Sequence, residues 1–181
     1  MNKFKLRSKI LKIRKKNSNK NLEINLSKFF SFLKIIKLKS KNIGGYFPSN
    51  FEIDDLKILE MMEKKNFNIS LPAIKENNQM NFLKWSKNDP LKINKFGIPE
   101  PISSKIINPD ILLVPLVSFD GKLNRLGYGG GFYDRYIEKI EKVKKVIKIG
   151  LAFSYQKIKK IPTNKFDRKL DFIITEKEIL Q

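Results

Sequence analysis

The sequence contains neither cysteine nor histidine. Without cysteine it forms no disulfide, carries no catalytic thiol and offers no thiolate to a metal ion. Without histidine it also lacks the most frequent general base and a frequent zinc ligand. Any catalysis must therefore rely on carboxylates, amines, guanidinium groups, hydroxyls or backbone amides.

Long apolar runs are also missing. No stretch approaches the roughly 20 apolar residues that span a membrane. Residues 1–16 are basic and contain no continuous apolar segment, which argues against a secretory signal. We therefore expect a cytoplasmic protein with no membrane partner. A length of 181 residues fits one domain, so we predict a single domain over residues 1–181 that acts as a monomer.

Arginine is scarce in a strongly basic chain. The formal net charge is +20, yet only five of the 38 basic residues are arginine, and lysine is spread along the whole sequence. A net charge of this size can indicate nucleic-acid binding. Because the lysines do not form one cluster, we interpret them as a solvated surface and expect no specific nucleic-acid partner. A basic RNA-binding protein is the alternative.

The apolar pattern alternates between helices and strands. Apolar spacings of three and four residues and helix-start signals predict helices over 3–16, 22–38, 54–65 and 132–144. Short apolar segments predict strands over 43–47, 67–71, 80–85, 110–117, 146–153 and 171–175, the second of them closed by Pro72. Two prolines and a glycine predict a loop over 95–101. This order indicates an α/β fold, and the run at 110–117 fits a strand buried on both faces of a parallel sheet.

Four of the nine glycines lie in the segment NRLGYGGGFYDR (124–135). The segment joins a buried strand to a helix, where glycine lets backbone N–H groups approach an oxyanion and the helix start adds positive potential. Arg125 and Arg135 flank the loop with forked donors that match phosphate. Asp134 is placed to hold Mg²⁺ against the phosphates. No Gly-Lys-Ser/Thr follows, so this is not a P-loop, but the residues together predict phosphate binding.

Six motifs follow one another along nearly the whole chain. They are KLR (5–7) with Arg14, YFPSNFEID (46–54), FGIPEP (96–101), VPLVSFD (114–120), RLGYGGGFYDR (125–135) and the aspartates at 167 and 171. Together they resemble the 5-formyltetrahydrofolate cyclo-ligase family, also called methenyltetrahydrofolate synthetases. The resemblance implies an α/β fold, a single three-layer α/β/α domain with a largely parallel central sheet.

The resemblance also implies a reaction. ATP and 5-formyltetrahydrofolate would give 5,10-methenyltetrahydrofolate, ADP and phosphate, with Mg²⁺ as cofactor. A formamide oxygen is a poor leaving group, so it first takes the γ-phosphoryl group. N10 of the folate then attacks, and phosphate departs as the ring closes. Phosphoryl transfer needs alignment and charge neutralisation more than acid–base groups, which suits a chain without histidine or cysteine.

Positions that match the family's motifs give the expected nucleotide site. Arg125 and Tyr133 are the expected catalytic residues, and Asp134 and Asp167 the expected magnesium ligands. The expected ATP contacts are Lys3, Arg7, Arg14, Arg125, Gly127, Tyr128, Gly129, Gly130, Gly131, Phe132 and Tyr133. Lys5 takes the place of Lys3 if the alignment shifts slightly, and a surface position is the alternative for Arg14. The alternatives for the carboxylates are a helix-start role for Asp134 and, for Asp167, either an ion pair with Arg168 or the capping of a turn.

The same resemblance gives the expected folate site. Glu52 matches the family's substrate-binding acid, and a carboxylate suits the donor pair formed by the amino group and ring N–H of a pterin. Tyr128 and Trp85 are expected to pack on the rings of the substrate, with a place in the core as the alternative. Eukaryotic members carry basic residues where this chain has Tyr128 and Gly130, so the phosphate-binding charge is expected from Arg125 and the first helix. Surrounding lysines would suit a polyglutamylated folate.

A third class of protein fits the same architecture. A sugar-phosphate isomerase or a CoA-transferase-like enzyme would share the α/β layers and a phosphate loop. Activity without ATP would favour such an enzyme, whereas salt-dependent RNA binding without ATP use would favour the RNA-binding protein.

Overall fold

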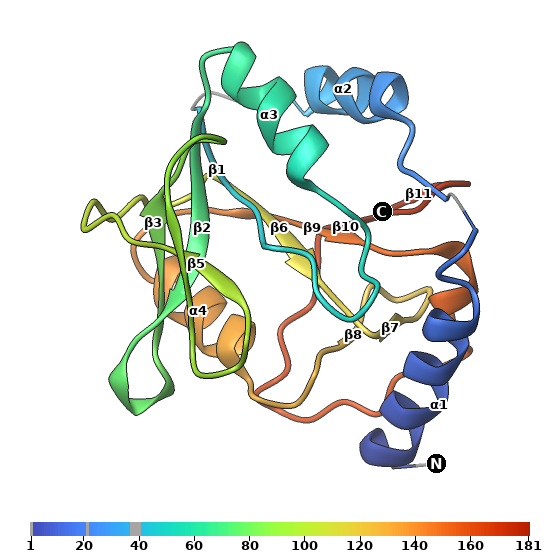
Figure 1. The fold of residues 1–181 in the computed structure, drawn as a ribbon. Coiled ribbons are helices and arrows are strands. Elements are labelled where there is room, and N and C mark those ends of the chain that lie inside the picture. Colours follow the sequence, from blue (N-terminus) through green and yellow to red (C-terminus); the bar gives the residue numbers. More distant parts are fainter. Residues whose placement is uncertain (1, 21, 37–40) are drawn as a thin grey trace.

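A mostly parallel sheet forms the centre of the computed structural model, which describes residues 2–20, 22–36 and 41–181. Its seven strands follow the order β11-β10-β9-β6-β1-β2-β3 (Figure 1). They are β1 (Asn42–Gly44), β2 (Asn68–Ile74), β3 (Met80–Lys84), β6 (Ile111–Pro115), β9 (Ile147–Leu151), β10 (Phe172–Ile174) and β11 (Ile179–Leu180). Neighbouring strands are parallel except at the edges, where β3 and β11 run antiparallel to their partners. The predicted α/β fold with a largely parallel sheet is confirmed.

Helices cover both faces of this sheet. The helices are α1 (Lys3–Lys16), α2 (Leu26–Ile35), α3 (Leu56–Lys64) and α4 (Phe132–Glu141). Figure 1 shows α2 and α3 on one face and α4 on the other. Side chains of β6 alternate accordingly, because Ile111 and Leu113 pack in the cluster under α2 and α3, whereas Leu112 and Val114 pack in the cluster under α4. The result is the expected three-layer α/β/α arrangement.

The path of the chain reverses between β1 and β6. From β1 it passes through α3 to β2 on one side, and later from β6 through α4 to β9 on the other side. Loops that leave the carboxyl ends of β1 and β6 therefore diverge. In open α/β sheets such a point forms a crevice in which ligands bind.

Two hairpins lie outside the main sheet. They are formed by β4 (Leu91–Ile93) with β5 (Pro99–Pro101), and by β7 (Ser118–Phe119) with β8 (Arg125–Leu126). Short 3₁₀ turns occur at Glu76–Asn78 and Ser154–Gln156. Helix α1 does not cover the sheet. Its apolar residues Leu6 and Ile10 pack against Val117, Leu126 and Ile161 around the second hairpin.

Two predictions based on proline are wrong. β2 continues past Pro72 to Ile74. The nitrogen of Pro72 is on the side of β2 that pairs with β1, but that pairing ends at Gly44, before it reaches Pro72. The missing N–H of proline therefore costs no hydrogen bond between the strands. The predicted loop 95–101 ends in strand β5. Asn94 donates its backbone N–H to the carbonyl of Ile98, and hydrogen-bonded and non-hydrogen-bonded pairs alternate along an antiparallel ladder. Pro99 and Pro101 occupy non-hydrogen-bonded positions, so their nitrogens point away from β4.

Most of the other elements form as predicted, with shorter boundaries. α2 starts at Leu26 rather than 22, because the side chain of Asn25 caps it by accepting from the N–H of Lys28. Positions 37 and 38 of that predicted helix lie outside the described residues. β1 ends at Gly44 rather than 47, and α4 ends at Glu141 rather than 144. Within the described part of the chain, no helix combines the length and the apolar character needed to cross a membrane.

Candidate active site

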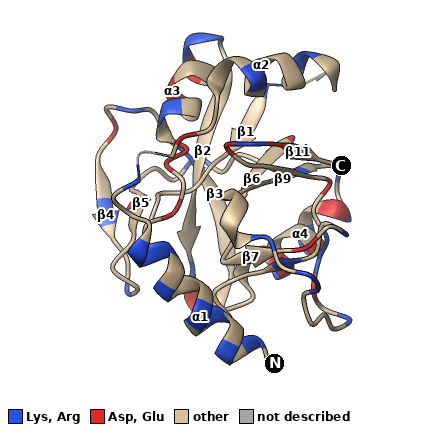
Figure 2. Cartoon of the chain, turned by 90° about the vertical axis from the view of Figure 1, so that its right-hand side faces the viewer, with Lys and Arg blue, Asp and Glu red and all other residues tan. Residues whose placement is uncertain are grey.

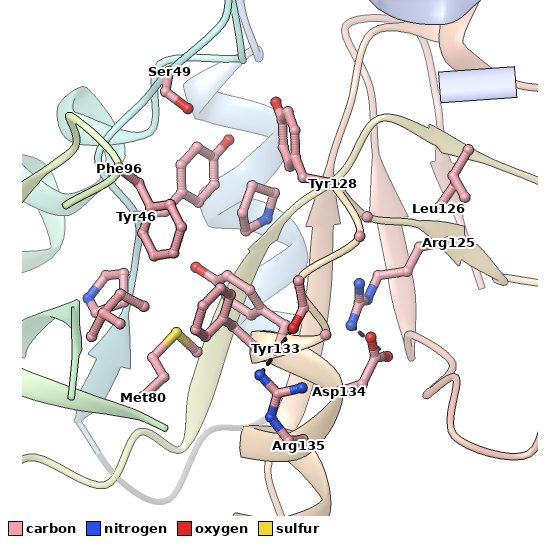
Figure 3. Close-up of a pocket in the computed structure, with 18 of the residues that line it drawn as sticks. Tyr46, Ser49, Met80, Phe96, Arg125, Leu126, Tyr128, Tyr133, Asp134 and Arg135 are labelled. Atoms are coloured by element: carbon pink, nitrogen blue, oxygen red, sulfur yellow. Dashed lines mark hydrogen bonds and ion pairs between the residues drawn. The ribbon is translucent and has the colours of Figure 1, made fainter. Parts of the chain in front are cut away.

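A cavity of about 790 Å³ opens where β1 and β6 end. Tyr46 and Phe47, which follow β1, and Pro115, which ends β6, line the cavity. The glycine loop, residues 127–131, forms another wall. In Figure 3 the rings of Tyr46, Phe96 and Tyr133 face across the cavity from Arg125 and Asp134. One end of the cavity is thus aromatic and the other is charged.

The glycine loop has the backbone shape that the sequence suggested. Gly129 has φ of 114° and Gly131 has φ of 66°, values that residues with a Cβ rarely adopt. Gly131 is also the N-cap residue of α4, so the loop delivers the start of that helix to the cavity. All the residues of 127–133 line the cavity. Free backbone N–H groups at such a helix start favour an anion.

Helix α1 contributes two basic side chains to the same wall. Arg7 donates from Nε to the carbonyl oxygen of Gly127 at 2.7 Å, and its guanidinium lies against Gly129. Lys3, one turn earlier, donates to both carboxylate oxygens of Asp167 at 2.8 and 2.6 Å. Both line the cavity, whereas Lys5 is exposed and does not. Of the two lysines, Lys3 therefore has the position from which a ligand in the cavity can be reached, and its contact with ATP stays a prediction.

Arg125 and Asp134 form an ion pair at the charged end. Nη2 of Arg125 lies 2.7 Å from Oδ1 of Asp134, drawn as a dashed line in Figure 3. The side chain of Arg125 is only 4% exposed, and its Nε has no hydrogen-bond partner among the described residues. A buried guanidinium with spare donors beside a glycine loop is suited to bind a phosphate.

The residues present fit Mg²⁺ in part. Within residues 2–20, 22–36 and 41–181, no three acidic side chains gather as a metal cage. Mg²⁺ needs none, since one or two carboxylates with substrate phosphates commonly hold it. In the described chain both hydrogen bonds to Asp134, from Arg125 and from the N–H of Arg168, fall on Oδ1. Its Oδ2 is therefore available to a metal ion.

Asp167 is more fully occupied than Asp134. Both of its oxygens accept from Lys3, and Oδ2 also accepts from the backbone N–H of Asn164 at 2.6 Å. It can ligate a metal only if Lys3 moves away. The alternative pairing of Asp167 with Arg168 does not form, because Arg168 pairs with Glu138 at 2.9 Å.

Glu52 faces the cavity from the turn after β1. Its Oε2 accepts from the N–H of Ser49 at 2.8 Å and from its hydroxyl at 3.3 Å, while Oε1 accepts from the hydroxyl of Tyr128 at 2.7 Å. Burial raises the pKa of Glu52, and the hydrogen bonds from Tyr128 and Ser49 act against that rise. The carboxylate is therefore held in place, while Oε1, which accepts one hydrogen bond, keeps a second lone pair for a ligand.

Tyr133 presents a hydroxyl with no partner. The group is buried and, among the described residues, makes no hydrogen bond, yet Tyr133 lines the cavity. Burial raises its pKa well above the ordinary value. The hydroxyl therefore stays protonated at neutral pH and is able to donate a hydrogen bond to a bound ligand.

Two expected contacts lie outside the cavity wall, and a third suggested donor is hydrogen-bonded within the protein. Trp85 is 6% exposed in the core cluster under α2 and α3 and does not line the cavity, so its predicted ring contact with the substrate is wrong. Arg14 is neither on the surface nor in the cavity wall, being 1% exposed behind Tyr128. Arg135 lines the cavity but donates to the carbonyls of Gly130 and Asn78.

The sequence reasoning also missed several residues of the cavity. Tyr46 and Phe96 belong to motifs that were noticed, but no role followed from the motifs themselves. Met80, Asn164 and Phe166 lie in segments without a motif. Only the pairing of β3 with β2 and the approach of residues 164–167 to α1 bring these residues to the cavity. Such long-range contacts leave no local signal.

The strand order, the glycine loop and the buried arginine define an α/β protein with a crevice suited to bind a phosphate group. Within that class, the chain belongs to the 5-formyltetrahydrofolate cyclo-ligase family, whose model matches residues 1–176. The 5-formyltetrahydrofolate cyclo-ligase of Haemophilus influenzae is 38% identical over 136 residues, which cover 71% of this chain and 72% of that protein. The enzyme of the same name from Escherichia coli is 30% identical over 135 residues, covering 71% and 74%.

Solved structures agree with the family. The 5,10-methenyltetrahydrofolate synthetase of Aquifex aeolicus superposes with a TM-score of 0.79 at 32% identity, covering 100% of this chain and 93% of that one. The 5,10-methenyltetrahydrofolate synthetase of Mycoplasma pneumoniae gives a TM-score of 0.72 at 26% identity, covering 98% and 100%. The resemblance read from the six motifs is confirmed, and the comparisons do not favour the RNA-binding or isomerase alternatives.

Proposed function

We propose that this protein uses ATP to convert 5-formyltetrahydrofolate into 5,10-methenyltetrahydrofolate, with release of ADP and phosphate. The observation that carries the proposal is that one cavity joins two kinds of wall in a member of this family. The charged end offers the glycine loop, Arg7 and Arg125. The other end offers aromatic rings and the carboxylate of Glu52.

We assign the triphosphate to the charged end. Residues 127–131 and the start of α4 line this part of the cavity, and Arg125 supplies a forked donor beside them. Lys3 and Arg7 add positive charge from α1. The pterin takes the aromatic end, where Glu52 accepts from its donor pair and Tyr128 borders the rings.

The chemistry follows from this division. The formyl oxygen attacks the γ-phosphorus, its new P–O bond replaces the bond to ADP, and Arg125 neutralises charge on the transferring oxygens. N10 then attacks the formyl carbon and loses its proton, while the C–O bond breaks and phosphate leaves. Tyr133, whose hydroxyl is protonated and otherwise unpartnered, donates a hydrogen bond to an oxygen of the reacting groups.

We assign Mg²⁺ to Asp134, with Asp167 as the second carboxylate. When bound there, the ion would neutralise charge on the phosphates. Asp134 lines the cavity and its Oδ2 accepts no hydrogen bond from the described residues, whereas Asp167 must first exchange Lys3. We also infer that the protein acts as a cytoplasmic monomer without a specific nucleic-acid partner. The lysine-rich surface, part of which is seen on α1 in Figure 2, suits a polyglutamylated folate.

A direct assay tests the proposal. Purified protein is mixed with Mg-ATP and 5-formyltetrahydrofolate, and the absorbance of the methenyl product is followed together with ADP. We expect about one ADP per product, as the mechanism requires, and no product without ATP or in EDTA. Product at full rate without nucleotide would exclude an ATP-dependent ligase and favour the isomerase-like class.

A further inference from the structure

Arg14 is a buried cation that does not touch the cavity. It lies on α1 with 1% exposure, and its Nη1 donates to the carbonyl of Leu116 at 3.3 Å. Its Nη2 donates to the hydroxyl of Tyr128, and the guanidinium lies 5.5 Å from the centre of that ring. Burying a charge costs free energy unless neighbouring groups form hydrogen bonds or ion pairs with it. The partner that reaches the cavity here is Tyr128.

The direction of the next hydrogen bond is fixed by chemistry. A guanidinium has donors and no acceptor, so the hydroxyl of Tyr128 must accept from Arg14. Its single proton is then directed at Oε1 of Glu52, 2.7 Å away. The N–H of Ser49 fixes Oε2 as an acceptor in the same way. A proton on Glu52 cannot point at either partner, so both bonds use the carboxyl group as an acceptor, and such bonds are strongest to the charged carboxylate.

We propose that Arg14 is a positioning residue that acts through Tyr128 to hold Glu52 as an oriented, ionised acceptor. What this role means for folate binding rests on the proposed function, in which Glu52 pairs with the pterin. The hydrogen-bonded relay from Arg14 through Tyr128 to Glu52 does not rest on it. It links the first helix, the glycine loop and the turn after β1, so the phosphate-binding wall and the substrate acid share one hydrogen-bonded chain.

Arg14 counters the cost of burying the charge of Glu52. Tyr46, Asp55 and Tyr133 interact electrostatically with Glu52, but burial raises the pKa of each of them, which favours their neutral forms. Burial raises the pKa of Glu52, and the charge of Arg14 lowers it. Without Arg14, Glu52 would more readily take a proton and present a donor where the pterin needs an acceptor.

A titration in the free protein tests the relay without substrate. The carboxyl carbon of Glu52 is followed by ¹³C NMR across pH, with its signal identified by its loss in Glu52→Gln. In Arg14→Met we expect the midpoint to move to higher pH by on the order of one unit, the scale of losing a nearby opposite charge. Arg14→Lys should restore part of the shift. Lys15→Met, which removes an exposed charge from the same helix, should leave the midpoint unchanged.

Tyr128→Phe decides the question even if Arg14→Met does not fold. It keeps Arg14 and removes only the hydroxyl, and it should also raise the midpoint. An unchanged midpoint in Tyr128→Phe, or in a folded Arg14→Met, would overturn the proposal.

The same variants are then assayed with 5-formyltetrahydrofolate across pH. If Glu52 binds the folate, the acidic limb of kcat/KM moves upward with the NMR midpoint. A shifted midpoint with an unmoved acidic limb would keep the relay and remove Glu52 from the folate site.

Discussion

Lys3 and Asp167 are 164 positions apart in sequence, yet the Nζ of Lys3 lies 2.6 Å from Oδ2 of Asp167. The pair fastens the first turn of α1 onto the segment that precedes β10, and both residues line the cavity. It also sets a competition, because the carboxylate proposed to bind Mg²⁺ already holds a cation.

That competition predicts opposite effects of two substitutions. Asp167→Asn should raise the Mg²⁺ concentration for half-maximal activity by roughly tenfold, the lower end of what loss of a metal-site partner costs. Lys3→Met should lower this concentration at saturating ATP, because Asp167 loses its competing cation. Lys5→Met is the matched control, since Lys5 is exposed on the same helix. If both variants keep the magnesium dependence of the wild type, Asp167 is not a ligand.

Arg125→Lys should impair the use of ATP. Lysine keeps the charge but loses the planar fork that can bind two phosphate oxygens while holding Asp134. We expect kcat to fall by about 10²-fold or more, the scale of losing one donor to developing charge. Calorimetric affinity for the folate should change little. A variant with normal ATP kinetics and weakened folate binding would reverse the assignment of the two ends of the cavity.

Glu52→Gln should impair folate binding instead. The substitution keeps the size of the side chain but replaces one acceptor oxygen by a donor, which leaves a pterin donor unpaired at a cost of about 1–3 kcal/mol. That corresponds to roughly 5- to 150-fold in affinity. Titration calorimetry with ATP provides the internal comparison, because ATP affinity should be nearly unchanged. Should ATP binding weaken while folate binding is spared, the turn after β1 serves the nucleotide.

Asp55 predicts how stability depends on pH. The side chain is fully buried beside Tyr46, and this burial raises its pKa well above the ordinary value. In the unfolded chain the carboxyl loses its proton near pH 4, whereas the folded state keeps it to higher pH. The folded state therefore binds more protons in that window, and the free energy of unfolding falls as pH rises through it.

Asp55→Asn should remove much of this dependence. The amide stays neutral, so the variant should be more stable than the wild type above the folded pKa of Asp55. Urea unfolding at several pH values measures the difference, with Asp54→Asn, an exposed neighbour, as the control. Parallel pH profiles for wild type and Asp55→Asn would show that Asp55 is not protonated in the folded state.

Local sequence patterns predicted the elements well and their long-range contacts poorly. The loop 127–131 was recognisable because its glycines meet a local backbone requirement, which Gly129 and Gly131 confirm. Whether Pro72 ends a strand depended on how far its neighbour β1 extends, which no window around Pro72 contains. Trp85 was misplaced for a similar reason, because an aromatic residue looks the same in a core and in a binding site.

The distant partners of α1 have a consequence for how the protein is made. Arg14, Arg7 and Lys3 bind groups 102, 120 and 164 positions later. At ordinary rates of synthesis, the last of these appears on the order of ten seconds or more after the helix. During that interval the apolar residues Leu6 and Ile10 lack the surface that covers them in the finished protein. The helix that supplies Lys3 and Arg7 to the cavity is therefore also a segment that proteases and chaperones can reach while the rest of the chain is made.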